Sequence, residues 1–168
     1  EAGVDVLVHT TLGEGKTVWE PALVEQLISK NIAVVPTLQL WPYELKRAKL
    51  EPRIVELATG DAVEQLRAFA KAGGQVLFGT DVGYMADYDP TEEYRLMARA
   101  LTPMKILASL TTAPAARWKE KARRGVIDPG LDADLVVLEA DPAVDAANFA
   151  KVRCTIRGGR LIYGPKGG

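Results

Sequence analysis

The feature that most constrains the fold of this sequence is an apolar strand that ends in a carboxylate. Residues 75–83 read QVLFGTDVG, in which an apolar run leads through Gly79 and Thr80 to Asp81. The carboxyl end of a parallel strand is where α/β proteins place their functional groups. The one histidine of the chain, His9, closes a second apolar run, VDVLVHT. Two ionisable groups at two strand ends predict one shared mouth at the edge of a parallel sheet.

Strands and helices alternate through the first part of the chain. Strands are predicted at Val4–Val8, Ile32–Leu38 and Gln75–Thr80 from their apolar and β-branched runs. Helices are predicted at residues 20–30 and 61–72, and after the capping residues Thr91, Thr102 and Thr112. Residues 41–56 indicate a mixture of helix and loop. This alternation predicts an α/β fold with parallel strands and right-handed crossovers.

The character of the sequence changes after about Arg124. Residues 125–141 and 152–163 are predicted to form short strands, punctuated by Pro129-Gly130 and by a hairpin turn at Gly158-Gly159. We therefore expect two parts, residues 1–123 and residues 124–168. The second part is too small for a core of its own, so we expect it to join a β layer completed by residues outside this chain.

Composition excludes several classes of function. The 168 residues are 48% hydrophobic with a formal net charge of −1, which gives no sign of nucleic-acid or membrane binding. One cysteine, Cys154, excludes an internal disulfide framework and is predicted to pack as a small residue in a strand. A cytoplasmic location is favoured, and a secreted or periplasmic one stays open because any signal peptide would lie upstream of Glu1.

Five segments together resemble metal-dependent amidohydrolases, especially the imidazolonepropionase-like and Xaa-Pro-dipeptidase-like members. The segments are AGVDVLVHTTL (Ala2–Leu12), VVPTL (Val34–Leu38), LFGTDVG (Leu77–Gly83), LASLTTAPA (Leu107–Ala115) and GVIDPGLDADLVVLEADP (Gly125–Pro142). The resemblance implies strands 6 to 8 of a (β/α)8 barrel, followed by strands of a small β-sandwich domain. It also implies a C-terminal fragment of a hydrolase that cleaves C–N bonds in amide, cyclic amide or dipeptide-like substrates.

The resemblance also implies roles for individual residues. His9 matches a metal-binding or substrate-contacting histidine, and Asp81 matches an aspartate that binds metal and acts as general base. Trp41, Tyr84 and Tyr88 are candidate substrate contacts. The family's other ligands lie upstream, so the site for one or two zinc or other divalent ions is expected to be incomplete here. The isolated chain is then expected to be inactive and to need the missing half of the barrel or a second copy.

Other interpretations of these residues remain open at this point. His9 could be a core or rim histidine, Asp81 could cap the turn after its strand, and Trp41 could cover the barrel rim as well as floor a pocket. Asp132 and Asp134 are better explained by turn chemistry than by catalysis. The whole chain could also be a non-catalytic relative or an interaction module that lacks a complete metal site.

Overall fold

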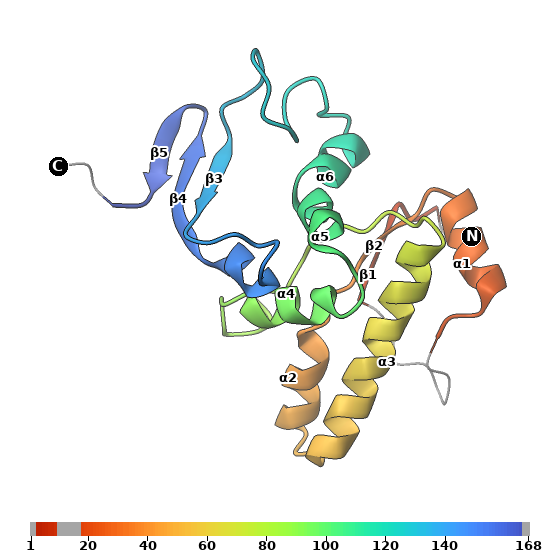
Figure 1. Ribbon diagram of the computed structural model, residues 1–168. Coiled ribbons are helices and arrows are strands. Elements are labelled where there is room, and N and C mark those ends of the chain that lie inside the picture. The colour runs from red at the N-terminus through yellow and green to blue at the C-terminus, as the bar shows by residue number, and fades with distance from the viewer. Residues whose placement is uncertain (1–2, 10–17, 166–168) are drawn as a thin grey trace.

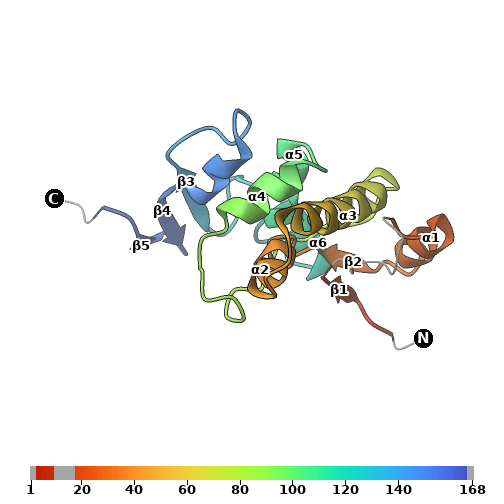
Figure 2. The same ribbon diagram turned by 90° about the horizontal axis from the view of Figure 1, so that it is seen from below.

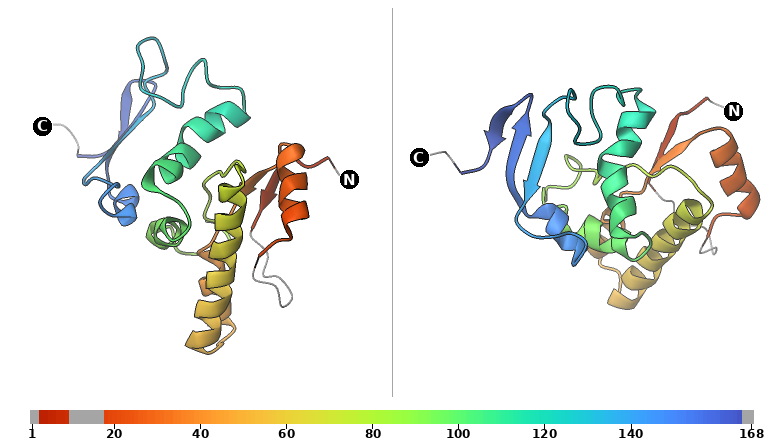
Figure 3. Two further views of the ribbon diagram at one scale, coloured as in Figure 1. Left: turned by 45° about the vertical axis from the view of Figure 1, so that its right-hand side comes forward. Right: turned by 45° about the horizontal axis from the view of Figure 1, so that its top comes forward.

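The structure is a computed structural model that describes residues 3–9 and 18–165 (Figure 1). Its elements are, along the chain, β1 (Val6–Val8), α1 (Pro21–Ser29), β2 (Ala33–Val35), α2 (Leu40–Arg47), α3 (Pro52–Lys71), α4 (Thr91–Ala98), α5 (Pro103–Leu110), α6 (Thr112–Arg117), β3 (Leu135–Leu138), the 3-10 helix η1 (Ala146–Ala150), β4 (Val152–Arg157) and β5 (Arg160–Tyr163). The sheet of β3, β4 and β5 lies at one end of the molecule and the β1–β2 pair lies toward the other, with α4 and α5 between them (Figures 1, 2 and 3). The predicted α/β class is confirmed.

The first sheet is parallel, as the alternation of strands and helices predicts. β1 pairs with β2, and a parallel bridge joins Val34 of β2 to Val76. The predicted third strand is reduced to this bridge, in which the amide of Val34 donates to the carbonyl of Gln75 and the amide of Leu77 donates to the carbonyl of Val34. The amide of Phe78 donates to the carbonyl of Ser109 in α5. β2 ends before Pro36, which lacks the N–H group that a sheet ladder needs.

Helix α3 is longer than predicted and begins at Pro52 rather than at Asp61. Proline suits the first turn of a helix because its missing N–H group has no partner there anyway. Gly60 lies inside the helix, where glycine costs about 1 kcal/mol relative to alanine. The buried residues Val55 and Thr59 continue the inner face on its N-terminal side, and their burial offsets that cost.

The three predicted threonine caps differ in outcome: Thr112, like Thr91, is the first residue of its helix and not its cap. Thr102 accepts a hydrogen bond from the amide of Lys105, which confirms the predicted cap of α5. Thr91 does not cap α4. It is the first helical residue, and its amide and hydroxyl both donate to the carboxylate of Asp89. These hydrogen bonds lower the pKa of Asp89.

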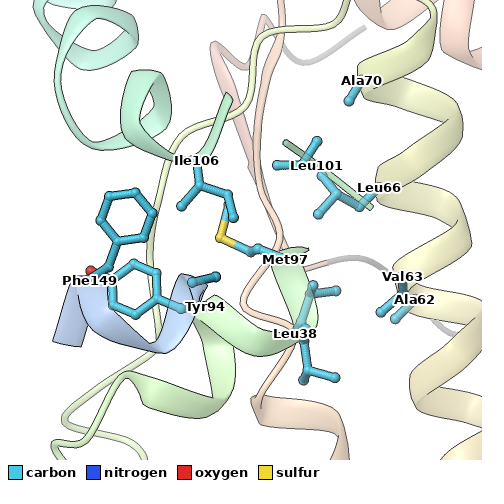
Figure 4. Packing of buried hydrophobic residues seen from close by; sticks show 12 residues of the cluster. Leu38, Ala62, Val63, Leu66, Ala70, Tyr94, Met97, Leu101, Ile106 and Phe149 are labelled. Carbon is cyan, nitrogen blue, oxygen red and sulfur yellow. The ribbon is translucent and has the colours of Figure 1, made fainter. Parts of the chain in front are cut away.

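One hydrophobic core joins the helices to the C-terminal part. It contains residues of α3, α4, α5 and η1 (Figure 4). The ring of Tyr94 in α4 stacks on Phe78 with centroids 4.7 Å apart and lies 5.3 Å from Phe149 of η1. The C-terminal part therefore shares its buried apolar surface with the helices, and a division at residue 124 stays a prediction.

The C-terminal sheet contains the predicted hairpin. β4 and β5 are antiparallel and are joined by Gly158 and Gly159, both with positive φ, as tight hairpin turns require. Residues 125–134 are not a strand, contrary to the prediction. The carboxylate of Asp132 pairs there with Arg123 and Arg124.

Asp134, two residues further along, accepts a hydrogen bond from the amide of Gly158 in the hairpin turn. Asp134 thus has the turn role predicted for it, whereas the carboxylate of Asp132 forms ion pairs instead.

Candidate functional site

Three strand ends carry residues in the left-handed conformation, which non-glycine residues adopt rarely. His9 follows β1 with φ 65°, Thr37 follows β2 with φ 46°, and Asp81 follows the bridged third segment with φ 59°. Among the described residues, the other non-glycine residues with positive φ are Asn31, Lys49 and Lys119, which each come directly after the C-cap of a helix. Helix capping explains those three. It does not explain the strand ends, and backbone strain of this kind concentrates at functional sites.

His9 is attached to the end of β2 by two hydrogen bonds. Its amide donates to the carbonyl of Val35 over 2.9 Å. Its ring nitrogen Nδ1 lies 2.7 Å from the hydroxyl Oγ1 of Thr37. Both contacts cross from β1 to β2, so the neighbouring strand fixes the backbone and the ring of His9.

Asp81 begins a tight turn that the main chain closes. Its carbonyl accepts hydrogen bonds from the amides of Tyr84 and Met85, at 3.2 and 3.3 Å. The hydrogen bonds of this turn use the carbonyl of Asp81 rather than its carboxylate. Because β1, β2 and the bridged segment run parallel, His9 and Asp81 follow their strands at the same edge of the sheet. Two strand spacings of ~4.8 Å lead us to expect the side chains within roughly 10 Å of each other.

Gly79, two residues before Asp81, allows the third segment to lie close to β2. A Cβ atom at this position would lie 2.5 Å from Cγ1 of Val35, well inside van der Waals contact. Valine is stiff at χ1 and cannot turn aside cheaply. The glycine of the GTD motif therefore sets the distance between the strand end that bears Asp81 and its neighbour.

A buried carboxylate ties the loop after β2 to α4. Glu93 is 0% exposed, and its Oε2 accepts a hydrogen bond of 2.7 Å from the amide of Gln39. In return, the amide of Glu93 donates to the side-chain oxygen of Gln39 over 3.2 Å. The Nε2 group of Gln39 also reaches the carbonyl of Thr80, at 3.5 Å. Glu93 and Gln39 therefore connect the segment that carries Thr37 with the segment that carries Asp81.

The environment of Glu93 favours its protonated form. Burial raises the pKa of this carboxyl group from 4.5 to about 7, against the opposing effect of the backbone amides of Gln39 and Leu38. Oε1 of Glu93 has no hydrogen-bond partner among the described residues. A proton on that oxygen removes the cost of burying a charge.

The three aromatic candidates differ in their surroundings. Trp41, in α2, is half-buried and packs against the core cluster of Figure 4. Tyr84 is exposed, and its hydroxyl donates to Glu44 of α2 over 3.1 Å. Tyr88 is 78% exposed in the same loop as Tyr84. None of these contacts tests a role in substrate binding, which stays a prediction for all three.

Sequence reasoning missed the parts played by Thr37, Gln39 and Glu93. Thr37 lies in the VVPTL segment but received no role, since its left-handed conformation leaves no mark in the sequence. Glu93 lies in the first turn of α4, where an acidic residue also suits the helix dipole. Its spacing of three and four residues from the buried Leu96 and Met97 is the signal that places it on the inner face.

The described residues offer a partial set of metal ligands. Imidazole nitrogen and carboxylate oxygen, which His9 and Asp81 supply, are both donors that zinc uses in proteins. In residues 3–9 and 18–165, no three His, Cys, Asp or Glu side chains gather closely enough to hold a metal ion. Hydrolytic zinc usually has three protein ligands. His9 and Asp81 thus fit such a site in chemistry but not in number.

Comparison with solved structures shows the same fold in several hydrolases. A Xaa-Pro dipeptidase with methionine bound in its active site superposes with a TM-score of 0.80 at 24% identity, over 96% of this chain and 40% of that one. A prolidase in complex with N-methylphosphonate-L-proline gives a TM-score of 0.74 at 27% identity, over 96% and 41%. An ochratoxinase from A. niger gives 0.75 at 21% identity, over 99% and 38%. The chain thus spans about 40% of the length of these proteins.

Comparison with curated proteins gives no match. The sequence profile of the amidohydrolase family, in contrast, matches residues 7–163, which is nearly the whole chain. Both strand ends of interest, at His9 and Asp81, fall inside this match. The chain belongs to the amidohydrolase family.

Proposed function

We propose that this chain forms one side of the active-site mouth of a hydrolase that cleaves a C–N bond in a small amide, cyclic amide or dipeptide-like molecule. The observation that carries the proposal is the set of left-handed strand ends in a chain of the amidohydrolase family, with His9 and Asp81 at one edge of the sheet. The similar prolidase and dipeptidase structures support an amide substrate.

The proposal assigns each sheet to a part of a larger molecule. β1, β2 and the bridged segment are taken as strands 6, 7 and 8 of a (β/α)8 barrel, and β3 to β5 as part of a β-sandwich domain. The coverage of about 40% of the similar hydrolases supports this assignment. The remaining barrel strands would come from further polypeptide or from a second copy of the chain. Val136 and Val137 follow one another on β3 and so point to opposite faces of the sheet, and both are exposed, which leaves apolar surface on each face for further polypeptide to cover.

His9 and Asp81 have distinct chemical roles in this proposal. Both would hold a zinc ion or another divalent metal, together with ligands that the described residues do not supply. A bound zinc ion lowers the pKa of its water to about 7. The carboxylate of Asp81 would take the proton from the attacking water and pass it to the leaving amine. Trp41, Tyr84 and Tyr88 are proposed to contact the substrate.

The isolated 168-residue chain is expected to bind zinc weakly and to hydrolyse Xaa-Pro dipeptides and N-acyl amino acids slowly, because it offers two ligands where three are usual. Competition with a chromophoric chelator measures the affinity, and amine release measures the activity. His9→Ala should abolish the weak binding, whereas Asp87→Asn, in the loop after Asp81, should leave it unchanged. Tight stoichiometric zinc that is lost in His9→Ala would show that the ligand set is complete here.

The same ligand count favours a second candidate function, a non-catalytic relative of the hydrolases. The two candidates differ once the missing strands are supplied. A catalytic protein gains zinc and hydrolytic activity when the chain is combined with a polypeptide that supplies the other barrel strands. A non-catalytic relative gains neither, although the two parts still associate.

The edge of β1 opposite β2 gives an expected result in solution. Among the described residues β1 pairs with β2 alone, and Val4 and Val8 on this segment are 54% and 49% exposed. Unpaired strand edges are templates for association. We therefore expect dimers or larger species in sedimentation velocity, and fewer of them in Val4→Lys. A wild-type monomer at high concentration, with slow amide exchange along Val4–Val8, would contradict this.

A further inference from the structure

We propose that Thr37 holds His9 in the tautomer that carries its proton on Nδ1, so that Nε2 presents the lone pair of the ring. This inference deepens the proposed function and rests on it for the use of that lone pair. Thr37 is then a positioning residue: it acts through His9 and does not itself touch substrate.

The hydroxyl group of Thr37 has a single proton to donate. Oγ1 of Thr37 lies 2.8 Å from the carbonyl oxygen of Pro36, and a carbonyl oxygen can only accept. We place the hydroxyl proton on this contact, because a proton given to His9 instead would leave two acceptor oxygens facing each other at 2.8 Å. The same Oγ1 lies 2.7 Å from Nδ1 of His9. With its proton already engaged, the hydroxyl accepts in this second contact, and Nδ1–H of His9 must be the donor.

The surroundings of Thr37 make this arrangement stable. Its side chain is 3% exposed, so water competes little for the hydroxyl. The backbone hydrogen bond between the amide of His9 and the carbonyl of Val35 holds the two strand ends in register. The left-handed conformation of both His9 and Thr37 aims their side chains to meet across the gap between β1 and β2.

The chemical consequence falls on the other ring nitrogen. A neutral imidazole has one N–H group and one lone pair, so a proton on Nδ1 puts the lone pair on Nε2. Histidines that bind metal usually donate their second ring N–H to a nearby acceptor, which fixes the ring and its tautomer. The hydroxyl of Thr37 is that acceptor for His9.

The test uses the 168-residue chain labelled with ¹⁵N. Because His9 is its only histidine, one two-dimensional spectrum that correlates ring protons with ring nitrogens reports the tautomer without further assignment. At about pH 8.5, where an ordinary imidazole is neutral, the protonated nitrogen resonates well upfield of the nitrogen with the lone pair. We expect Nδ1 to show the protonated signal as the major form. A majority of the Nε2–H form, or an even mixture, would overturn the proposal.

Three variants distinguish the effect of the Thr37 hydroxyl group on the His9 tautomer from the effect of the shape of the Thr37 side chain. Thr37→Val keeps the β-branched shape and the backbone strain but removes the acceptor, so the major tautomer should reverse to Nε2–H, which free imidazole favours in water. Thr37→Ser should retain the wild-type signal. Thr80→Val, at the neighbouring strand end, should also retain it, because the contact of Thr80 with Gln39 uses its carbonyl. An unchanged tautomer in Thr37→Val would overturn the proposal, as would reversal in Thr80→Val.

The readout is independent of metal and of hydrolysis. If the tautomer follows Thr37 while the assembled protein binds no zinc, the proposed function fails and the positioning by Thr37 stands. If zinc and activity are found but the tautomer ignores Thr37, the proposed function stands and this inference fails.

Discussion

Replacement of Asp81 by asparagine is expected to lower kcat of the hydrolytically active protein by at least ~10²-fold, which is the usual contribution of a general base. Asparagine preserves the size of the side chain and the carbonyl that closes the turn to Tyr84 and Met85. It removes the charge that accepts a proton. The loss should therefore appear in kcat more than in KM. Steady-state kinetics on a dipeptide or N-acyl amino acid substrate measure both.

The matched control is Asp87→Asn. Asp87 lies six residues further along the same loop, where its carboxylate accepts a hydrogen bond from the amide of Asp89. This variant should keep kcat close to that of the wild type. An unchanged rate in Asp81→Asn would leave Asp81 as a structural turn residue and would remove the catalytic base from the proposed mechanism.

Glu93 is expected to make the folded state less stable as pH rises. Its pKa is about 7 in the folded chain against 4.5 for an ordinary glutamate, so the folded state holds the proton more tightly. The stabilisation is complete below about pH 4.5 and is lost as pH rises through about 7. The shift corresponds to a contribution on the order of 3 kcal/mol to the free energy of unfolding. Urea unfolding at a series of pH values between 4.5 and 8 measures it.

Glu93→Gln isolates this contribution from the other titrating groups. Glutamine is neutral throughout, and its amide oxygen can still accept from the backbone amide of Gln39. The variant should match the wild type near pH 4.5 and exceed it at pH 8. Glu92→Gln is the control, because Glu92 occupies the same turn of α4 with its side chain 53% exposed. Parallel pH profiles for Glu93→Gln and the wild type would show that the buried carboxyl does not titrate in this range.

The sequence predicted the parts of the site that depend on strand ends. Apolar runs that end in His9 and Asp81 are visible in the sequence, and the alternation with helices makes the strands parallel, which brings both ends to one edge. The helix start predicted at Thr102-Pro103 and the hairpin predicted at Gly158-Gly159 were both confirmed. Each depends on contacts between residues that are close together in the sequence. Interactions between neighbours in the sequence can be predicted from the sequence alone.

Features that depend on distant contacts were missed. The amide of Phe78 has its partner in α5, 31 residues further along the chain. The reciprocal hydrogen bonds of Gln39 and Glu93 span 54 residues. The hydroxyl of Thr37 meets His9 across 28 residues. No local pattern marks such pairs, and the polar network between the strand ends becomes evident only in the folded chain.

The central claim is that His9 and Asp81 face one mouth, and a zinc titration followed at the ring nitrogens of His9 tests it most directly. In the wild-type chain, excess zinc should shift the Nε2 resonance of His9 with a weak apparent Kd. Asp81→Asn should weaken that response several-fold, while Asp87→Asn should leave it unchanged. If zinc shifts Nε2 equally in the wild type and in Asp81→Asn, the two side chains do not share a site, and the account is wrong.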